Sequence, residues 1–239
     1  MISTIYNEAI YRPLLNLLVF FYNIIPGHDI GVVIVLLTVL IRLVLAPSFH
    51  KSLKSQKALN DLQPKLNELK EKHKDNKEAQ ARALMDLYKE HKINPLGSCL
   101  PLLVQLPVLI ALYQVFSKAL NNHLTGLYSF VTRPEMINPK FLGLVDLSKP
   151  SLVFGIVAGL AQYWQSKLMM PKNPGNQDAA AKAMALQTTY VLPVISVIIA
   201  IKLPAGLPLY WIVTTLFAVG QQYWINRKSA ATAVELVNK

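Results

Sequence analysis

Apolar residues are gathered into five long runs that are separated by polar segments. The runs cover residues 30–49, 96–117, 151–170, 186–202 and 207–225. A lipid hydrocarbon core about 30 Å thick takes about 20 helical residues at 1.5 Å each. We therefore predict an all-α integral membrane protein with five transmembrane helices. The fourth run is the shortest and contains Pro193, so a buried helix of a soluble core is its alternative interpretation.

Residues 1–29 precede the first run and alternate polar and apolar positions at helical spacing. Glu8, Arg12, Asn16 and Asn23 fall on one side, and leucine, phenylalanine and isoleucine fall on another. This pattern predicts an amphipathic helix at the outer membrane interface. A sixth span over residues 13–25 is the alternative, but 13 residues are few for a bilayer crossing.

Residues 50–95 form the most polar segment, with 11 basic and 7 acidic residues. Two narrow apolar seams, Leu59 to Leu69 and Ala83 to Tyr88, flank the helix-breaking stretch at 73–76. Two seams joined by a turn predict an antiparallel helical hairpin. Such a basic hairpin would be attracted to anionic lipid head groups or to an RNA-containing partner such as a ribosome.

The distribution of positive charge predicts how the chain is oriented. Residues 50–95, 171–185 and 226–239 hold 16 of the 24 Lys and Arg residues, whereas the segments in alternation with them hold 6. The positive-inside rule then places residues 50–95, the loop at 171–185 and the tail at 226–239 in the cytoplasm. The N-terminus and the proline-rich loop at 118–150 lie outside.

Composition narrows the class of protein further. Hydrophobic residues make up 53% of the 239 residues and the mean hydropathy is +0.34, so the net charge of +11 fits loops around spans better than a DNA-binding surface. Cys99 is the only cysteine, the five histidines lack paired ligand spacing, and no phosphate-binding G-x-x-x-x-G-K-[ST] loop occurs. We expect no metal, no cofactor and no enzymatic chemistry.

Arg42 stands within the apolar stretch LTVLIRLVLAP, about 18 Å from the outer end of its span and about 10 Å from the inner end. A guanidinium at the centre of a span costs about 2.5–3.5 kcal/mol on insertion scales. Snorkelling toward the cytoplasmic head groups is the simple explanation. The five runs contain no Asp or Glu but do contain amides and hydroxyls, which predicts instead a wet cavity that binds a polar or acidic ligand.

Neutral polar residues that could surround Arg42 occur in every span. Many of them are expected to join helices rather than to line a cavity, and Trp211 also suits an interface anchor. The set comprises Thr38, Gln105, Gln162, Gln165, Gln187, Tyr190, Ser196, Tyr210, Thr214, Thr215, Gln221 and Gln222.

Three long blocks resemble the family of YidC, mitochondrial Oxa and chloroplast Albino membrane-protein insertases. The blocks are TVLIRLVLAPSFHKSLKSQKALNDLQPKLNELKEKHKDN, NPLGSCLPLLVQLPVLIALYQVF and GLPLYWIVTTLFAVGQQYWINR, and with their spacing they cover roughly residues 20–228. The resemblance implies five helices around a hydrophilic groove that opens to the cytoplasm and to lipid. It assigns Arg42 to the groove, with Thr38 beside it and Gln105, Gln162, Gln187, Tyr210 and Trp211 as further substrate contacts.

The resemblance also implies the partners, and nascent membrane proteins are the expected substrates. The lack of a transit-like N-terminus favours a bacterial inner membrane as the location. The ribosome, targeting factors and the Sec translocon would bind the 50–95 hairpin and the inner loops. The sequence lacks the large periplasmic domain and the lipobox of many relatives, and its tail after Arg227 is short, so we expect a short member with a weak tail contact to the ribosome.

The predicted function is an insertase that helps nascent chains to enter the bilayer, alone or with Sec. A transporter or channel with an anion-binding Arg42 is one alternative, although no internal repeat is visible. A structural partner that packs beside other membrane proteins is the other, and it would tolerate loss of the arginine.

Overall fold

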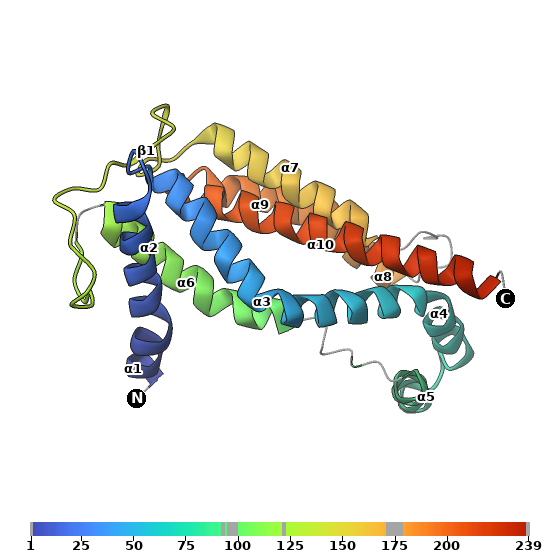
Figure 1. The fold of residues 1–239 in the computed structure, drawn as a ribbon. Coiled ribbons are helices and arrows are strands. Elements are labelled where there is room, and N and C mark those ends of the chain that lie inside the picture. Colours follow the sequence, from blue (N-terminus) through green and yellow to red (C-terminus); the bar gives the residue numbers. More distant parts are fainter. Residues whose placement is uncertain (1, 92–93, 95–99, 121–122, 171–178, 238–239) are drawn as a thin grey trace. The chain divides into compact units, whose positions relative to one another are not determined.

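The structure is a computed structural model that describes residues 2–91, 94, 100–120, 123–170 and 179–237. Most of these residues are helical (Figure 1). The chain divides into two compact units. Unit 1 comprises Met1–Val44, Leu102–Gln162 and Pro193–Phe217, and unit 2 comprises Leu45–Pro101, Tyr163–Leu192 and Ala218–Lys239.

The elements follow one another along the chain as Figure 1 labels them. They are α1 (Ile2–Tyr6), the π-helix η1 (Asn7–Tyr11), α2 (Arg12–Ile24), α3 (Ile30–Asp61), α4 (Gln63–Lys72), α5 (Lys77–Glu90), α6 (Leu100–Leu120), β1 (Lys140–Phe141), β2 (Val145–Asp146), α7 (Leu152–Met169), α8 (Ala179–Leu186), the π-helix η4 (Gln187–Val191), α9 (Leu192–Ala200) and α10 (Gly206–Val237).

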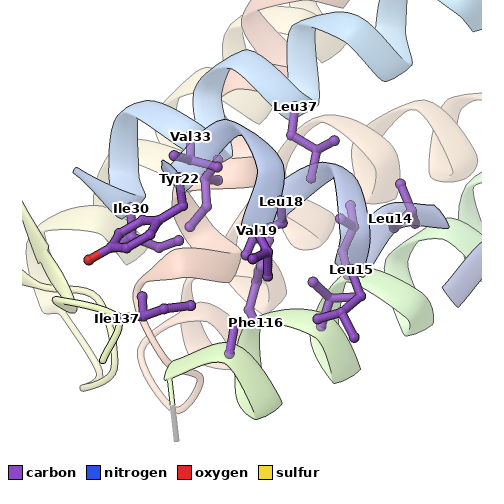
Figure 2. Close-up of a cluster of buried hydrophobic side chains, with 14 of the residues drawn as sticks. Leu14, Leu15, Leu18, Val19, Tyr22, Ile30, Val33, Leu37, Phe116 and Ile137 are labelled. Atoms are coloured by element: carbon purple, nitrogen blue, oxygen red, sulfur yellow. The ribbon is translucent and has the colours of Figure 1, made fainter. Parts of the chain in front are cut away.

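The core of unit 1 gathers apolar side chains from α2, the first part of α3, α6 and the start of α10. Figure 2 shows Leu15, Leu18 and Val19 of α2 converging with Val33 of α3 and Phe116 of α6. The first three are fully buried, so the apolar face of α2 packs against protein. Helix α2 ends where Ile25 becomes extended (φ −75°, ψ 127°), a conformation that the following proline favours.

The polar face of α2 holds the segment after α6. Buried Asn16 donates to the carbonyl of Gly126 at 3.3 Å, and its Oδ1 accepts the backbone N–H of Tyr128 at 2.7 Å. Arg12 Nε also donates to the Gly126 carbonyl. Two of the polar residues that predicted an amphipathic helix, Arg12 and Asn16, therefore bind the segment after α6.

A short hairpin in the 118–150 segment is fixed to the start of α3. Strands β1 and β2 are antiparallel, with Phe141 opposite Val145. Asp29 Oδ2 accepts the N–H of Leu142 at 2.5 Å, and its Oδ1 accepts two N–H groups in the first turn of α3. Gly31 lets the Phe141 ring approach α3, because a methyl group there would lie 2.1 Å from the ring.

Helices α7 and α9 of unit 1 pack closely through two glycines at a four-residue spacing. A methyl group on Gly155 would lie 2.5 Å from Cγ2 of Ile201, and one on Gly159 would lie 2.3 Å from Cγ2 of Val197. Small residues at this spacing let helix backbones approach, as they do within membranes.

Large apolar side chains on the outward positions of unit 1 remain exposed. They lie on α3, α6, α7 and α9 and include Leu36, Leu43, Val44, Leu106, Ile110, Leu152, Val153, Ile156, Leu160, Val194, Ile198 and Ile199. An apolar surface of this extent is costly in water and is favourable in lipid. Among the described helices, α3 alone is long and apolar enough to pass as a span, with a mean hydropathy of 2.7 in its most apolar 18-residue window.

Unit 2 contains the polar hairpin. Leu66 of α4 and Leu87 of α5 are buried together with Leu62, and Gln80 Nε2 donates to the carbonyl of Lys70 at 2.9 Å. Asn76 caps α5 by accepting the N–H of Ala79. Residues 73–76 separate the two helices, and this is where the sequence contains the helix-breaking stretch.

Three details differ from the sequence-based expectations. Helix α3 continues beyond residue 49 through Pro47 to Asp61, and Pro64 then limits its extension because proline lacks an N–H group. Residues 179–185, expected in a loop, are helical, which agrees with the high helix propensity of their alanines. The strands at 140–146 were not expected. The start of the second apolar run, residues 96–99, lies outside the described residues.

Candidate functional site

Arg42 lies on α3 within unit 1 and is only 6% exposed. Its Nη2 donates to Oε1 of Gln105 on α6 at 3.4 Å, which is long for such a bond. A buried guanidinium needs polar partners because desolvation of a charge is costly. The amide of Gln105 supplies one of those partners without adding a negative charge.

Gln105 also connects Arg42 to α10. Its Nε2 donates to the hydroxyl oxygen of Tyr210, a residue that is 2% exposed. The amide thus accepts from the arginine through its oxygen and donates to the tyrosine through its nitrogen. Three residues far apart in the sequence form one hydrogen-bonded chain across α3, α6 and α10.

Thr38 is buried one turn before Arg42 on α3. Its Oγ1 donates to the carbonyl of Ile34 in its own helix at 2.5 Å. This bond uses the hydroxyl proton, so the oxygen remains available only as an acceptor. Thr38 therefore adds a compact polar surface to the same helical face as Arg42.

The other candidate residues do not share a described hydrogen bond with Arg42. Gln162 of α7 is half-buried, and its Oε1 has no partner among the described residues. Trp211 follows Tyr210 on α10 and is also half-buried. Gln187 is exposed, begins the π-helix η4 and belongs to unit 2.

Thr214 was expected only as one of many polar residues that could surround Arg42. It lies one turn after Tyr210 on α10 and is buried, and its Oγ1 has no partner within the described part of the chain. The four-residue spacing from Tyr210 was the available signal, because residues i and i+4 share a helical face.

The arrangement is suited to binding rather than to bond making. It combines a fixed cation with an amide, a phenol and threonine oxygens, which together can hydrogen-bond to peptide groups and attract a carboxylate. Such a set can replace part of the hydration of a polar segment inside a low-dielectric region.

Residues 20–232 match the family described as 60Kd inner membrane protein. Proteins named membrane protein insertase YidC are similar to the chain: one from Geotalea daltonii is 39% identical over 226 residues, 94% of this chain and 38% of that protein. Another from Geobacter sulfurreducens is 38% identical over 224 residues, 93% of this chain and 38% of that protein. The chain thus spans less than half the length of these relatives.

Proposed function

Because the chain belongs to the 60Kd inner membrane protein family, we propose that it acts as a membrane protein insertase with Arg42 in its working groove. The observation that carries this proposal is the Arg42–Gln105–Tyr210 chain, whose arginine and tyrosine are buried, in a unit whose outward helix positions are apolar. A polar interior beside a lipid-facing exterior suits a protein that receives polar segments within a membrane.

We propose five membrane crossings at the apolar runs. The N-terminus lies outside, and the 50–95 hairpin and the C-terminus lie in the cytoplasm. The exposed apolar positions on α3, α6, α7 and α9 support this placement, as does the distribution of Lys and Arg along the chain. Residues 1–29 lie at the outer interface.

The proposed mechanism needs no covalent step. A short polar segment of a nascent chain enters the groove from the cytoplasm, where the Gln105 amide, the Tyr210 hydroxyl and Arg42 replace part of its hydration. The distance that the segment still has to cross becomes less than the full hydrocarbon thickness. The neighbouring apolar segment moves into lipid, and this transfer supplies the driving force.

The hairpin formed by α4 and α5 is the proposed docking surface for cytoplasmic partners. Residues 50–95, which include this hairpin and the end of α3, carry an excess of positive charge, and most charged side chains of α4 and α5 are exposed. Ribosomal RNA, targeting factors and the Sec translocon are its proposed partners, because basic surfaces attract polyanions and acidic patches.

The test is insertion by the purified chain alone in liposomes, measured by protease protection of a small single-span substrate. Two substrates are compared, one with an acidic outer tail and one with a neutral tail. Opposite charges about 8 Å apart at an effective dielectric of about 20 gain about 2 kcal/mol before screening, or about thirty-fold. Arg42→Ala should therefore reduce insertion of the acidic substrate by up to about thirty-fold and that of the neutral substrate less.

Arg42→Lys should retain part of the activity, because it keeps the charge but loses the fork of donors. Arg227→Ala is the matched control, since it removes an exposed arginine and should insert both substrates normally. Equal losses for the two substrates in Arg42→Ala would contradict the electrostatic role. Insertion no better than in empty liposomes would contradict a self-sufficient insertase and favour work with Sec.

A further inference from the structure

Lys167, Tyr163 and Tyr190 form a cluster in unit 2 that the proposed insertion mechanism does not use. Lys167 Nζ donates to the hydroxyl oxygen of Tyr190 at 3.1 Å. The same nitrogen lies 5.2 Å from the centre of the Tyr190 ring and 5.7 Å from that of Tyr163. Both distances are within the range of cation–π attraction, and the hydrogen bond places the ammonium at the hydroxyl edge of Tyr190.

The backbone around the cluster is joined by a second contact. Ser166 Oγ on α7 donates to the carbonyl of Thr188 in the π-helix η4 at 3.2 Å. The two tyrosine rings also contact each other, with centroids 5.8 Å apart. Short π-helical turns are uncommon and often occur at functional sites. Here the π-helix carries Tyr190, and the contact with α7 fixes it beside Lys167.

The cluster retains unused hydrogen-bond donors on an accessible surface. Lys167 has three N–H groups and gives one to Tyr190. Tyr190 accepts with its oxygen, so its own O–H proton is free to be donated elsewhere. Tyr163 is 37% exposed and Tyr190 is 45% exposed. Lys167 and Tyr190 can therefore still donate to a ligand that offers anionic oxygens.

We propose that Lys167, Tyr190 and Tyr163 bind the phosphate group of an anionic phospholipid in the cytoplasmic leaflet. The inference rests on the proposed function for the membrane placement, which puts the ends of the spans at 151–170 and 186–202 at the cytoplasmic interface. Lysine and tyrosine are both favoured at that depth. A phosphate diester offers two oxygens that share one negative charge to these donors, and the lysine selects lipids with net negative charge.

The test is native mass spectrometry of the 239-residue chain in detergent micelles, titrated with phosphatidylglycerol and, separately, with phosphatidylcholine. The unmodified chain should retain phosphatidylglycerol in preference to phosphatidylcholine. Lys167→Gln should lower the affinity for phosphatidylglycerol by about five-fold or more, because a lysine near anionic head groups contributes roughly that factor. Tyr190→Phe, which keeps the net charge, should lower it by about three-fold through loss of a hydrogen bond.

Lys182→Gln is the matched control, because Lys182 is also exposed and belongs to unit 2 but lies outside the cluster. Its affinity for phosphatidylglycerol should change by less than about two-fold. Equal losses in Lys167→Gln and Lys182→Gln, or an unchanged Tyr190→Phe, would overturn the proposal. Displacement of the lipid by millimolar inorganic phosphate would also overturn it, since the site would then be one for free phosphate.

This readout contains no nascent chain, so it separates the lipid site from the insertase function. A chain that selects phosphatidylglycerol but fails to insert a substrate in liposomes would support the lipid site and contradict the proposed function. A chain that inserts substrates but does not select phosphatidylglycerol would support the proposed function and contradict the lipid site. Circular dichroism of each variant checks that the helices are intact, as expected for substitutions at exposed side chains.

Discussion

Asp146 is the residue at which protonation should alter the hairpin of β1 and β2. Its Oδ1 accepts hydrogen bonds from the backbone N–H and the hydroxyl of Ser148, and its Oδ2 lies 3.0 Å from Nζ of Lys149. The hydroxyl of Ser148, followed by Lys149 and the backbone N–H of Ser148, lowers the pKa of Asp146 below its usual value near 3.8, although partial burial opposes this shift. The ionised carboxylate therefore stabilises the turn.

The pH dependence follows from the direction of that shift. Because the pKa is lower in the folded turn than in the unfolded chain, the stabilisation is present above about pH 4 and is lost as the pH falls through the folded value. Ser148→Ala should raise the pKa of Asp146 toward 3.8. Carboxyl ¹³C NMR across pH 2 to 6 measures it, with Ser129→Ala in the same segment as control. An unchanged titration in Ser148→Ala would show that the hydroxyl has no such role.

Some site residues can be predicted from the sequence alone, and others cannot. Arg42 could be identified because a charge in an apolar run is costly wherever the helix packs. The bridge from Gln105 to Tyr210 could not, because 105 residues separate the two and only tertiary packing brings them together. The sequence placed Asn16 on the polar face of its helix, but its bonds to Gly126 and Tyr128 depend on where the segment after α6 folds.

Helices α7 and α9 can pack closely because glycines of α7 place no side-chain atoms at their contact. The methyl group of an alanine at position 159 would lie 2.3 Å from Val197 Cγ2 and 3.2 Å from the Pro193 carbonyl oxygen. The side chain of Val197 can be shortened, whereas the carbonyl belongs to the backbone of α9. A larger residue at 159 therefore forces the two helices apart.

Gly159→Ala should lower the free energy of unfolding by about 1–3 kcal/mol, the usual cost of overpacking. Adding Val197→Ala should restore part of the loss, because it removes one of the two close contacts. Gly220→Ala is the control: no neighbouring atom lies near that position in α10, so stability should stay equal or rise by up to about 1 kcal/mol. Unfolding in mixed detergent–SDS micelles gives these values. Equal behaviour of the variants at 159 and 220 would contradict the close packing.

At the level of elements, local sequence signals predicted helices better than strands. The helix-breaking stretch at 73–76 marks the turn between α4 and α5 because Asn76 can cap the next helix. The two-residue strands β1 and β2 carry no alternating pattern long enough to detect. They are held by Asp29 and by Phe141 packing over Gly31, which are contacts between distant segments.

For the whole molecule, the exposed side chains of the two units indicate a protein that is partly in lipid and partly in water. The exposed side chains on α3, α6, α7 and α9 are predominantly large and apolar in unit 1, whereas those of the α4–α5 hairpin in unit 2 are predominantly charged. The first set avoids water and the second requires it. A membrane protein with a polar, water-exposed extension satisfies both conditions, and the excess of Lys and Arg in 50–95 predicts that this extension faces the cytoplasm.

That direction can be tested with single cysteines in a Cys99→Ser background, since Cys99 is the only native cysteine. Ser129→Cys lies in the segment assigned to the outside and Lys74→Cys at the hairpin turn, and both positions are exposed. A membrane-impermeant maleimide should label the variant at 129 in intact spheroplasts and the variant at 74 only after lysis. The opposite pattern would invert the topology and place the hairpin, with its proposed ribosome and Sec contacts, on the wrong side of the membrane. Labelling of both variants in intact spheroplasts would contradict an odd number of crossings between them, because residues 74 and 129 would then share one side.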